Sequence, residues 1–373
     1  MKQSLPKIVF LYLTGFSFTG GIEKFNRSFL KALHELSVDG YIDSDGFSSY
    51  DSATDEKYFP RLRFKGFKGN RFFFVIYAII KSLQYQSVII GHINLSIIGF
   101  VIKKIKPSVK VIMITHGIEV WREQSNFKKK TLEKADIILS VSKYTKYKLL
   151  EFNPHLNPDK IKIFPNTIDT YFKLPKTFSK PEYLLQRYAI DANKKILLTV
   201  TRMAYSEKYK GYDEVIEVLG MLKEKRSDIV YLICGKAEAE EKKRIEQLIL
   251  QYQLTDYVKL IGFVEDYELN DHYLLCDLFV MPSKKEGFGI VFIESLACGR
   301  NVIAGNKDGS TDALMNGALG TLIDPDNIHE LQQAIEKVLD TPTKNGANLQ
   351  TRVLDAFGFE KYKERLLTIL QEV

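Results

Sequence analysis

The 373-residue chain has few cysteines and no long hydrophobic run. Its three cysteines, Cys234, Cys276 and Cys298, stand among apolar or small residues without the spacing of metal ligands, which predicts reduced core thiols in a cytoplasmic protein. The longest unbroken apolar run, Phe72–Ile80, falls far short of the roughly 20 residues that span a bilayer. The early run Ile8–Leu13 has six residues, which predicts a core strand and not a secretory signal.

Several motifs are absent as well. The sequence contains no Walker loop and no Gly-x-Ser-x-Gly nucleophile, and it lacks heptads, solenoid repeats and a low-complexity tail. Asp43-Ser-Asp45 has the Asp-x-Asp spelling of a metal site, but it lies early in the chain, away from the strand ends of the second half. We therefore expect no metal ion and no other cofactor.

Positive charge is concentrated in the first half of the chain. Residues 1–180 hold 29 Lys/Arg against 15 Asp/Glu, and residues 181–373 hold 24 against 31, so the halves carry +14 and −7. Cations and aromatic residues mix in Arg61–Arg71 and the run after it, and lysines recur in Lys103–Lys106 and Lys128–Lys130. This pattern fits either a solvated face or peripheral docking on an anionic inner membrane. No nucleic-acid motif is present, so we expect no nucleic-acid partner.

Short apolar segments alternate with helical ones in both halves, which predicts an α/β fold with two doubly wound, Rossmann-like domains facing across a cleft. The polar stretch Pro175–Pro181 predicts the linker, so the first domain is expected at residues 1–178 and the second at 179–355. A last helix is expected at Phe359–Gln371. The predicted strands are Ile8–Leu13, Val88–Gly91, Lys110–Thr115, Asp136–Val141, Ile161–Phe164, Lys195–Val200, Ile229–Cys234, Val258–Ile261, Leu278–Pro282, Asn301–Ala304 and Gly320–Ile323.

The stretch from Glu286 to Glu294 carries the strongest functional signal. It has two carboxylates eight positions apart, a Gly-Phe-Gly turn after the first, and the pattern of a strand before it and a helix after it. A glycine-flexed loop entering a helix exposes N–H groups that suit phosphate or sugar oxygens, and a carboxylate accepts hydrogen bonds from neighbouring hydroxyls. The alternative is a solvated loop glutamate and a surface helix glutamate. A carboxylate in the apolar turn around Ile293 and Leu296 is not expected to be buried unpaired.

Three further sites follow predicted strands. Gly20-Gly21 precedes a helix, where close backbone approach to an anion is possible, although a simple tight turn has the same spelling. His116 follows Thr115 at a strand end and is either a structural histidine or a group that faces the cleft. Arg202, followed by Lys208 and Lys210 before a helix, can neutralise a departing diphosphate, and the alternative is surface charge.

The stretch at Glu286 closely resembles the donor-site motif of GT-B glycosyltransferases of the retaining family 4 type. That motif is Glu, seven residues and Glu, with Gly-Phe-Gly after the first Glu, and this chain matches each position. Six motif positions and the terminal helix occur in the family's order, so the resemblance covers nearly the whole chain. The matching motif positions are Gly20-Gly21, His116, Arg202, Lys210, Glu286 and Glu294. The resemblance implies the GT-B fold, with a C-terminal helix at about residues 356–373 that packs back on the first domain.

The resemblance also implies roles for the donor-side residues. Glu286 would bind the hydroxyls of the transferred sugar, Glu294 would bind the ribose, and Val264 would contribute a backbone contact to the base. The sugar would be held further by the backbone of the four residues after Glu286, namely Gly287, Phe288, Gly289 and Ile290. The diphosphate would be stabilised by Arg202, Lys210 and the amides of Gly20 and Gly21, with Lys208 as a rival to Lys210.

On the other side of the reaction, the resemblance implies that His116 lies near the transferred sugar and the reaction centre. Glu119 and Trp121 follow it in the sequence and are predicted to line the acceptor side. The leaving phosphate oxygen would take the acceptor's proton in a front-face substitution, so the enzyme would need no base of its own.

The implied activity is transfer of a hexosyl unit from a UDP- or GDP-linked sugar, with retention, to a glycan or lipid-linked acceptor in bacterial surface polysaccharide synthesis. The protein is expected in the cytoplasm or at the inner face of the cell membrane. Two alternatives remain from the sequence. One is another GT-B enzyme, such as an epimerase or a phosphorylase, although nothing marks a pyridoxal lysine. The other is a non-catalytic GT-B module in a polysaccharide assembly complex, in which the donor motifs should have decayed.

Overall fold

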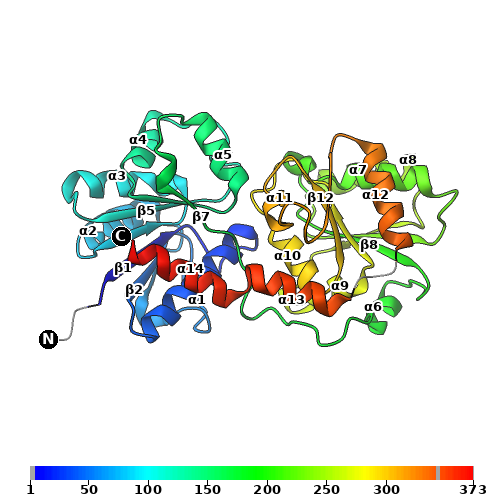
Figure 1. The fold of residues 1–373 in the computed structure, drawn as a ribbon, viewed down its shortest axis with the longest axis horizontal. Coiled ribbons are helices and arrows are strands. Elements are labelled where there is room, and N and C mark those ends of the chain that lie inside the picture. Colours follow the sequence, from blue (N-terminus) through cyan, green and yellow to red (C-terminus); the bar gives the residue numbers. More distant parts are fainter. Residues whose placement is uncertain (1–4, 342–344, 373) are drawn as a thin grey trace. The chain divides into compact units, whose positions relative to one another are not determined.

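The computed structural model describes residues 5–341 and 345–372. The chain divides into two compact units: unit 1 is Met1–Thr170 with Phe357–Val373, and unit 2 is Tyr171–Ala356. Figure 1 shows both units and labels their α-helices and several of their strands. Within the described residues, no helix has both the length and the apolar character needed to cross a bilayer.

Unit 1 is built on a parallel sheet with the strand order β3-β2-β1-β4-β5-β6-β7. Its strands are β1 Lys7–Tyr12, β2 Asp43–Ser48, β3 Phe64–Gly66, β4 Ser87–Ile90, β5 Lys110–Thr115, β6 Ile137–Ser140 and β7 Ile161–Ile163. Its helices are α1 Gly21–Val38, α2 Arg71–Ser82, α3 Ser96–Ile105, α4 Asn126–Lys134, α5 Lys143–Phe152 and α14 Phe359–Gln371, with the short 3₁₀ helices η1 Arg61–Arg63, η2 Ile93–Leu95 and η3 Pro158–Lys160.

Alternate residues of the unit 1 strands face two helical layers, because side chains alternate across a strand. On one face of β1, Val9 and Leu11 join the core formed with α2, α3, α4 and α5. On the other face, the Phe10 ring packs against Phe29 of α1 with centroids 4.7 Å apart. α14 returns to this second layer beside α1, as predicted, and Tyr362 packs on Phe164 with centroids 4.4 Å apart.

β2 and β3 are missing from the predicted strands, because their residues are mostly polar or small. Asp43 and Asp45 lie on β2, where Arg63 pairs with both and the Tyr85 hydroxyl donates to Asp45 at 2.6 Å. The two aspartates of this Asp-x-Asp sequence therefore form structural ion pairs. Gly46 lets the strand pass close to α1, since a Cβ at this position would lie 3.0 Å from the Leu30 side chain.

Unit 2 is built on a second parallel sheet, with the strand order β10-β9-β8-β11-β12-β13. Its strands are β8 Lys195–Val200, β9 Ile229–Cys234, β10 Val258–Gly262, β11 Leu278–Met281, β12 Asn301–Gly305 and β13 Thr321–Ile323. Its helices are α6 Glu182–Arg187, α7 Tyr212–Leu222, α8 Ala239–Gln251, α9 Asp266–Leu275, α10 Ile290–Ala297, α11 Ser310–Ala313, α12 Ile328–Asp340 and α13 Gly346–Phe357, with the 3₁₀ helix η4 Tyr205–Lys210.

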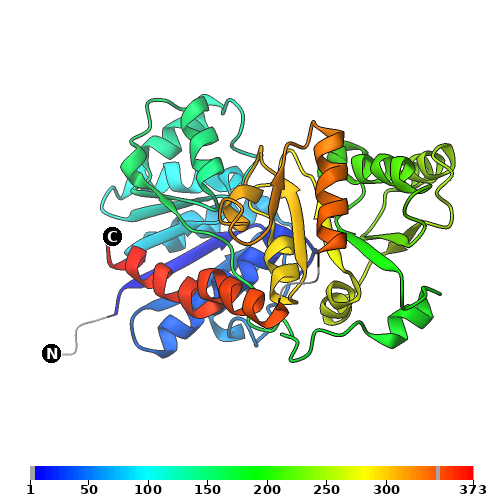
Figure 2. The same ribbon diagram turned by 45° about the vertical axis from the view of Figure 1, so that its right-hand side comes forward.

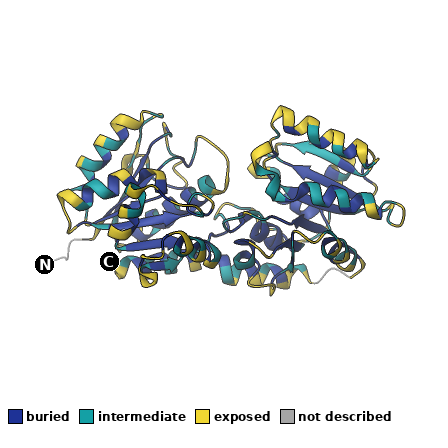
Figure 3. Cartoon of the chain, turned by 90° about the horizontal axis from the view of Figure 1, so that it is seen from above, coloured by how far each residue is buried: buried dark blue, intermediate teal, exposed yellow. Residues whose placement is uncertain are grey.

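The sheet of unit 2 is also covered on both faces. Leu197, Tyr231 and Val280 pack against α7, α8 and α12. Phe279 faces the other way, towards Tyr273 of α9 and Phe292 of α10. Figure 2 gives a second view of the helices around the strands, and Figure 3 shows the strands buried beneath the exposed outer faces of the helices. The two parallel sheets with helices on both faces confirm the predicted pair of Rossmann-like domains, and the three cysteines are free and buried as expected.

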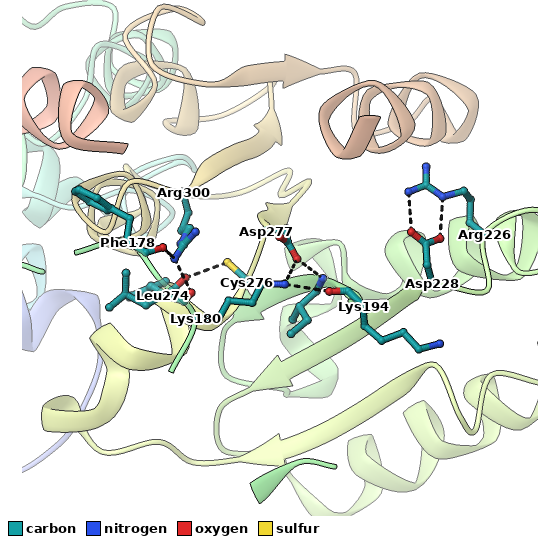
Figure 4. A network of polar contacts seen from close by, with 11 residues as sticks. Phe178, Lys180, Lys194, Arg226, Asp228, Leu274, Cys276, Asp277 and Arg300 are labelled. Carbon is teal, nitrogen blue, oxygen red and sulfur yellow. Dashed lines mark hydrogen bonds and ion pairs between the residues drawn. The ribbon is translucent and has the colours of Figure 1, made fainter. Parts of the chain in front are cut away.

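The boundary between the units differs from the predicted one at residues 178 and 179. The segment Tyr171–Phe178 belongs to unit 2, because several contacts tie it there. The Arg300 guanidinium donates to the Phe178 carbonyl at 2.6 Å and also to the Leu274 carbonyl at 2.6 Å, as Figure 4 shows. Shortly after this segment, the Lys180 ammonium pairs with Asp277 at 2.6 Å, so the chain is already anchored before β8 begins.

Candidate active site

The loop between β11 and α10 has the strand–loop–helix form predicted for the Glu286 motif. β11 ends at Met281 and α10 begins at Ile290. Gly289 caps the helix with φ = 90°, and a Cβ at this position would overlap the Phe292 ring. A side chain is therefore disfavoured at Gly289 by both the left-handed backbone and the lack of space. Phe288 is buried beside it, which anchors the turn.

The backbone of Glu286 is held from a neighbouring loop, between β12 and α11. Its N–H donates to the Asp308 carboxylate at 2.6 Å, and its carbonyl accepts from the Gly309 N–H at 2.7 Å. A Cβ on Gly309 would overlap the carbonyl of Gly287, so only glycine permits this approach. Asp308 is buried, and burial raises its pKa to about 7. The sequence prediction missed Asp308 and Gly309, and an Asp-Gly pair after a strand is the only signal that marked them.

Lys210 is the cation that contacts Glu286. The two side chains form an ion pair of 2.5 Å and are 16% and 18% exposed. Burial alone lowers the pKa of Lys210, but the Glu286 carboxylate outweighs it, so the pKa is raised and the ammonium stays charged. Gly211 follows with φ = 86°, and a Cβ there would lie 2.6 Å from Pro282. This close approach of the two loops places Lys210 beside Glu286.

Arg202 and Lys208 have other partners. The Arg202 side chain is 62% exposed and pairs with Glu207, whose hydrogen bond raises the Arg202 pKa. The Lys208 ammonium lies over the Tyr205 ring, 4.0 Å from its centroid. The structure therefore brings Lys210 and Glu286 together, while Arg202 and Lys208 interact with other residues on the same stretch.

Glu294 lies on α10 and is 1% exposed. The Tyr273 hydroxyl of α9 donates to its carboxylate at 2.9 Å. Burial raises the pKa of Tyr273 well above its usual value, and the charge of Glu294 adds to this effect. A buried carboxylate with a hydroxyl partner fits the expectation that this glutamate is not left unpaired. Val264 lies half-buried on the loop after β10.

In unit 1, Gly20 and Gly21 are exposed at the start of α1. The loop that leads to them is organised by Asp51, a buried residue that the sequence prediction missed. Its carboxylate accepts from the Thr14 and Ser48 hydroxyls, each at 2.8 Å, and from three successive backbone N–H groups, those of Gly15, Phe16 and Ser17, at 2.8 to 3.1 Å. These five bonds fix the path of the chain between β1 and α1.

His116 follows β5 and is held on both its ring and its backbone. Its Nε2 lies 2.7 Å from the Gly91 carbonyl, which can only accept, so Nε2 carries the proton and Nδ1 carries the lone pair. Its backbone N–H donates to Glu119 at 2.5 Å. Burial lowers the pKa of His116, although the charge of Glu119 and the hydrogen bond to Gly91 act to raise it. Burial also lowers the pKa of the neighbouring His92, to about 4. The two imidazoles, with centroids 6.2 Å apart, are therefore neutral at pH 7.

Trp121 packs against the core of unit 1. Its indole N–H donates to the Thr145 hydroxyl at 3.3 Å, and its ring lies 5.0 Å from that of Tyr144. Glu119 is the partner of the His116 backbone. Both residues thus have internal partners, and their predicted place on the acceptor side stays a prediction.

A second Asp-x-Asp sequence, Asp324-Pro-Asp326, does follow a strand end of unit 2, and the sequence prediction overlooked it. Lys307 pairs with both aspartates at 2.6 Å, and Lys284 pairs with Asp326 at 3.0 Å. Across residues 5–341 and 345–372, no group of three or more His, Cys, Asp or Glu side chains is placed to hold a metal ion. The predicted independence of metal ions stays a prediction.

Comparison with family models gives two matches that share the chain between them. The model described as Glycosyltransferase Family 4 matches residues 19–172, within unit 1 apart from its last two residues. The model described as Glycosyl transferases group 1 matches residues 182–352, within unit 2. The second match contains Arg202, Lys210 and Glu286, and the first contains His116.

Two of the curated relatives show the likeness at the level of sequence, and both are named as mannosyltransferases. A GDP-mannose-dependent alpha-(1-6)-phosphatidylinositol monomannoside mannosyltransferase of Mycolicibacterium smegmatis is 24% identical over 250 residues, which are 64% of this chain and 63% of that protein. A GDP-mannose-dependent monoacylated alpha-(1-6)-phosphatidylinositol monomannoside mannosyltransferase of Corynebacterium glutamicum is 26% identical over 277 residues, which are 70% of each chain. The alignment thus spans less than two thirds of the first of these proteins.

Among solved structures, Anabaena HepE in complex with UDP aligns over 98% of this chain and 100% of its own, with a TM-score of 0.75. At 18% identity this likeness bears on the fold alone. The two family models establish the family of this chain, and the structural likeness supports its fold. The protein belongs to the glycosyltransferases of the family 4, group 1 type, an enzyme family with the GT-B fold.

Proposed function

We propose that this protein is a retaining, metal-independent hexosyltransferase that uses a UDP- or GDP-linked sugar and a glycan or lipid-linked acceptor. The observation that carries the proposal is the Lys210–Glu286 pair at 2.5 Å, set at the glycine-flexed entrance to α10. A carboxylate and an ammonium on one site suit the two halves of a sugar diphosphate. The carboxylate accepts from sugar hydroxyls, and the ammonium donates to phosphate oxygens.

In this proposal, Glu286 holds the hexose, helped by the backbone of Gly287–Ile290. Its own backbone is fixed by Asp308 and Gly309, so the carboxylate starts from a defined position. An ammonium has three N–H donors, so Lys210 can keep its bond to Glu286 and still donate to the diphosphate. A fixed positive charge beside the leaving group lowers the barrier as negative charge develops there. Arg202, on the same unit, supplies further donors.

Glu294 is proposed to bind the ribose and Val264 to contact the base. For Glu294 this role requires an exchange of partners or a shared carboxylate, because the Tyr273 hydroxyl already donates to it at 2.9 Å. His116 is proposed to bind a sugar hydroxyl. As a neutral imidazole with its proton on Nε2, it offers the lone pair of Nδ1 as an acceptor. The leaving phosphate oxygen takes the acceptor's proton, so no separate base is required.

The proposal includes two nucleotides, GDP and UDP. The relatives from Mycolicibacterium and Corynebacterium are named as GDP-mannose-dependent, and HepE is described in complex with UDP. The acceptor is proposed to be a lipid-linked or membrane-proximal glycan of a bacterial surface polysaccharide, with the protein at the inner face of the cell membrane. The excess of positive charge in residues 1–180 supports this location.

A thermal-shift screen tests the donor site directly. The purified protein is heated with UDP, GDP, ADP and their common sugar conjugates, with and without EDTA. A ligand at about 100 times its dissociation constant stabilises the folded state by about 2.7 kcal/mol, so one nucleotide should raise the melting temperature clearly. The shift should persist in EDTA, disappear in Glu294→Gln, and remain in Glu246→Gln, a control on the exposed side of α8. A chain that no nucleotide stabilises would contradict the proposal.

A further inference from the structure

One flank of unit 1 combines an exposed apolar helix face with unbalanced positive charge. The helix is α2, Arg71–Ser82, which packs beside α3 (Figure 1). Phe74 and Ala78 point into the core. The opposite face exposes Phe72 at 70%, Phe73 at 62%, Ile76 at 41% and Ile80 at 58%. We call these four residues the outer face of α2.

An apolar outer face is unusual for a surface helix, which is normally polar on the side away from the core. The residues of this face are spaced so that they share one side of the helix, because positions three and four apart are neighbours. α2 contains no acidic residue. Asn70 caps its first turn, and on the core side Phe67 packs on Phe74 with centroids 5.4 Å apart.

The stretch of sequence that contains α2 carries charge of one sign. Between Glu56 and Glu119 the sequence has no Asp or Glu across 62 residues, but it has eleven Lys and Arg. Four of these cations pair with acids outside the stretch, through Asp55, Asp43, Asp45 and Asp136. The other seven form no ion pair with any residue that the structure describes. They are Arg61, Lys65, Lys68, Arg71, Lys81, Lys104 and Lys106.

We propose that the outer face of α2 and the cations around it dock unit 1 on an anionic lipid bilayer, with the phenylalanines in the interface and the cations at the headgroups. An apolar helix face beside Lys and Arg is the arrangement that binds in the plane of an anionic bilayer. A second copy of this chain fits less well, because it would bring the same unpaired charge to the contact. A nucleic acid would leave the four apolar side chains without a partner.

This inference names the surface behind the proposed membrane location, and it is tested separately from the proposed transfer. The full chain is sedimented with vesicles of phosphatidylcholine alone and of phosphatidylcholine mixed with phosphatidylglycerol. The wild type should bind only the anionic vesicles, and less so at high salt. Phe72→Ser with Phe73→Ser should weaken binding at least about tenfold, because the variant has no aromatic side chains at these positions to transfer from water into the bilayer interface. Lys65→Gln with Lys68→Gln should weaken binding and flatten its salt dependence.

The matched control removes exposed apolar residues elsewhere, through Val38→Ser and Leu250→Ser, which are 71% and 65% exposed in the wild type. This control should bind vesicles as the wild type does. A second measurement does not depend on the loss of binding in a variant. In Phe73→Trp, the new indole should be quenched by brominated anionic lipid, whereas Trp121, the only native tryptophan, should not be.

Several results would overturn the proposal. They are a wild type that ignores anionic vesicles, a serine double variant that binds as tightly as the control, or an indole at position 73 that brominated lipid does not quench. A serine double variant that turns a dimer into a monomer without changing vesicle binding would assign the face to a second copy instead. The nucleotide-induced thermal shift, measured without vesicles, should be equal in the wild type and the serine double variant. A failure of vesicle binding would therefore not count against the proposed donor site, and a failure of nucleotide binding would not count against membrane docking.

Discussion

The backbone N–H of Glu286 donates to the buried carboxylate of Asp308 at 2.6 Å, across 22 positions of sequence. The next residue, Gly309, returns a hydrogen bond to the Glu286 carbonyl at 2.7 Å. The residue proposed to hold the sugar is therefore fixed at its backbone by a group that does not belong to the recognised motif. Asp308 also accepts from the Ser310 N–H at 2.9 Å, so both of its oxygens have a backbone donor.

Asp308 should make the stability of unit 2 depend on pH. Burial raises its pKa to about 7 from the ordinary 3.8, so between these values the folded chain holds a proton that the unfolded chain releases. The free energy of unfolding should therefore fall as the pH rises from about 4 to about 7. Asp308→Asn, which cannot ionise, should lack this decline. Urea unfolding of both proteins across this range measures the difference. Asp256→Asn, at an exposed position of the same unit, serves as the control, and a constant difference between wild type and Asp308→Asn would contradict the assignment.

Lys210 and Lys208 lie two residues apart on η4, and only Lys210 contacts Glu286. Lys210→Met should lower nucleotide-sugar turnover by about 100-fold, because it removes the fixed charge that is proposed to lie beside the leaving group. Lys208→Met should lower it by less than about tenfold, because the Lys208 ammonium lies over Tyr205 instead. Steady-state turnover of the two variants decides between them. Equal losses, or a larger loss in Lys208→Met, would reverse the assignment.

Substitution of Gly289 and of Gly262 by alanine distinguishes backbone strain from steric overlap. Both have a positive φ, 90° and 81°, but a Cβ on Gly289 would overlap the Phe292 ring, whereas nothing lies within 4 Å of one on Gly262. Gly262→Ala should cost about 1–2 kcal/mol of unfolding free energy from the left-handed backbone alone. Gly289→Ala should cost more, since overpacking adds about 1–3 kcal/mol. Thermal and urea unfolding compare the two, and equal losses would mean that the Phe292 ring moves aside freely.

Asp51 should stabilise unit 1 through the loop that leads to Gly20. Asp51→Asn replaces one acceptor oxygen by an amide donor, which leaves buried N–H or O–H groups without a partner. An unsatisfied buried donor costs about 1–3 kcal/mol, so the unfolding free energy should fall by at least that amount. Asp55→Asn, at a surface position of the same loop region, should change it by less than about 0.5 kcal/mol. Similar losses in both variants would show that the five bonds to Asp51 are not what orders the loop.

The regular elements of unit 2 were the most predictable part of the chain. Lys195–Val200 and Ile229–Cys234 have the predicted bounds, because their apolar residues follow the pattern of buried strands. β2 and β3 could not be predicted in this way. They are polar or glycine-containing strands near the edge of the sheet, and their pairing depends on partners far away in sequence.

The site was predictable where one motif contains it and not where distant segments meet. Glu286, Gly289 and Glu294 could be named from their spacing. Asp51 and Asp308 could not, because their partners are backbone N–H groups that only the fold brings to them. The sequence preferred Lys210 to Lys208, and the fold adds that Lys210 contacts Glu286 while Lys208 lies over Tyr205.

The most direct test of the central claim is release of the nucleoside diphosphate from UDP-glucose and GDP-mannose, with water taking the sugar in place of the acceptor, measured in EDTA for the wild type and for Glu286→Gln. The wild type should release UDP or GDP from one of these donors or from a close relative of it. Glu286→Gln should fold normally and release it about 100-fold more slowly, because it loses the carboxylate that pairs with Lys210 and that is proposed to hold the sugar. A wild type that releases no nucleotide from any sugar donor, or a Glu286→Gln variant as fast as the wild type, would contradict the account.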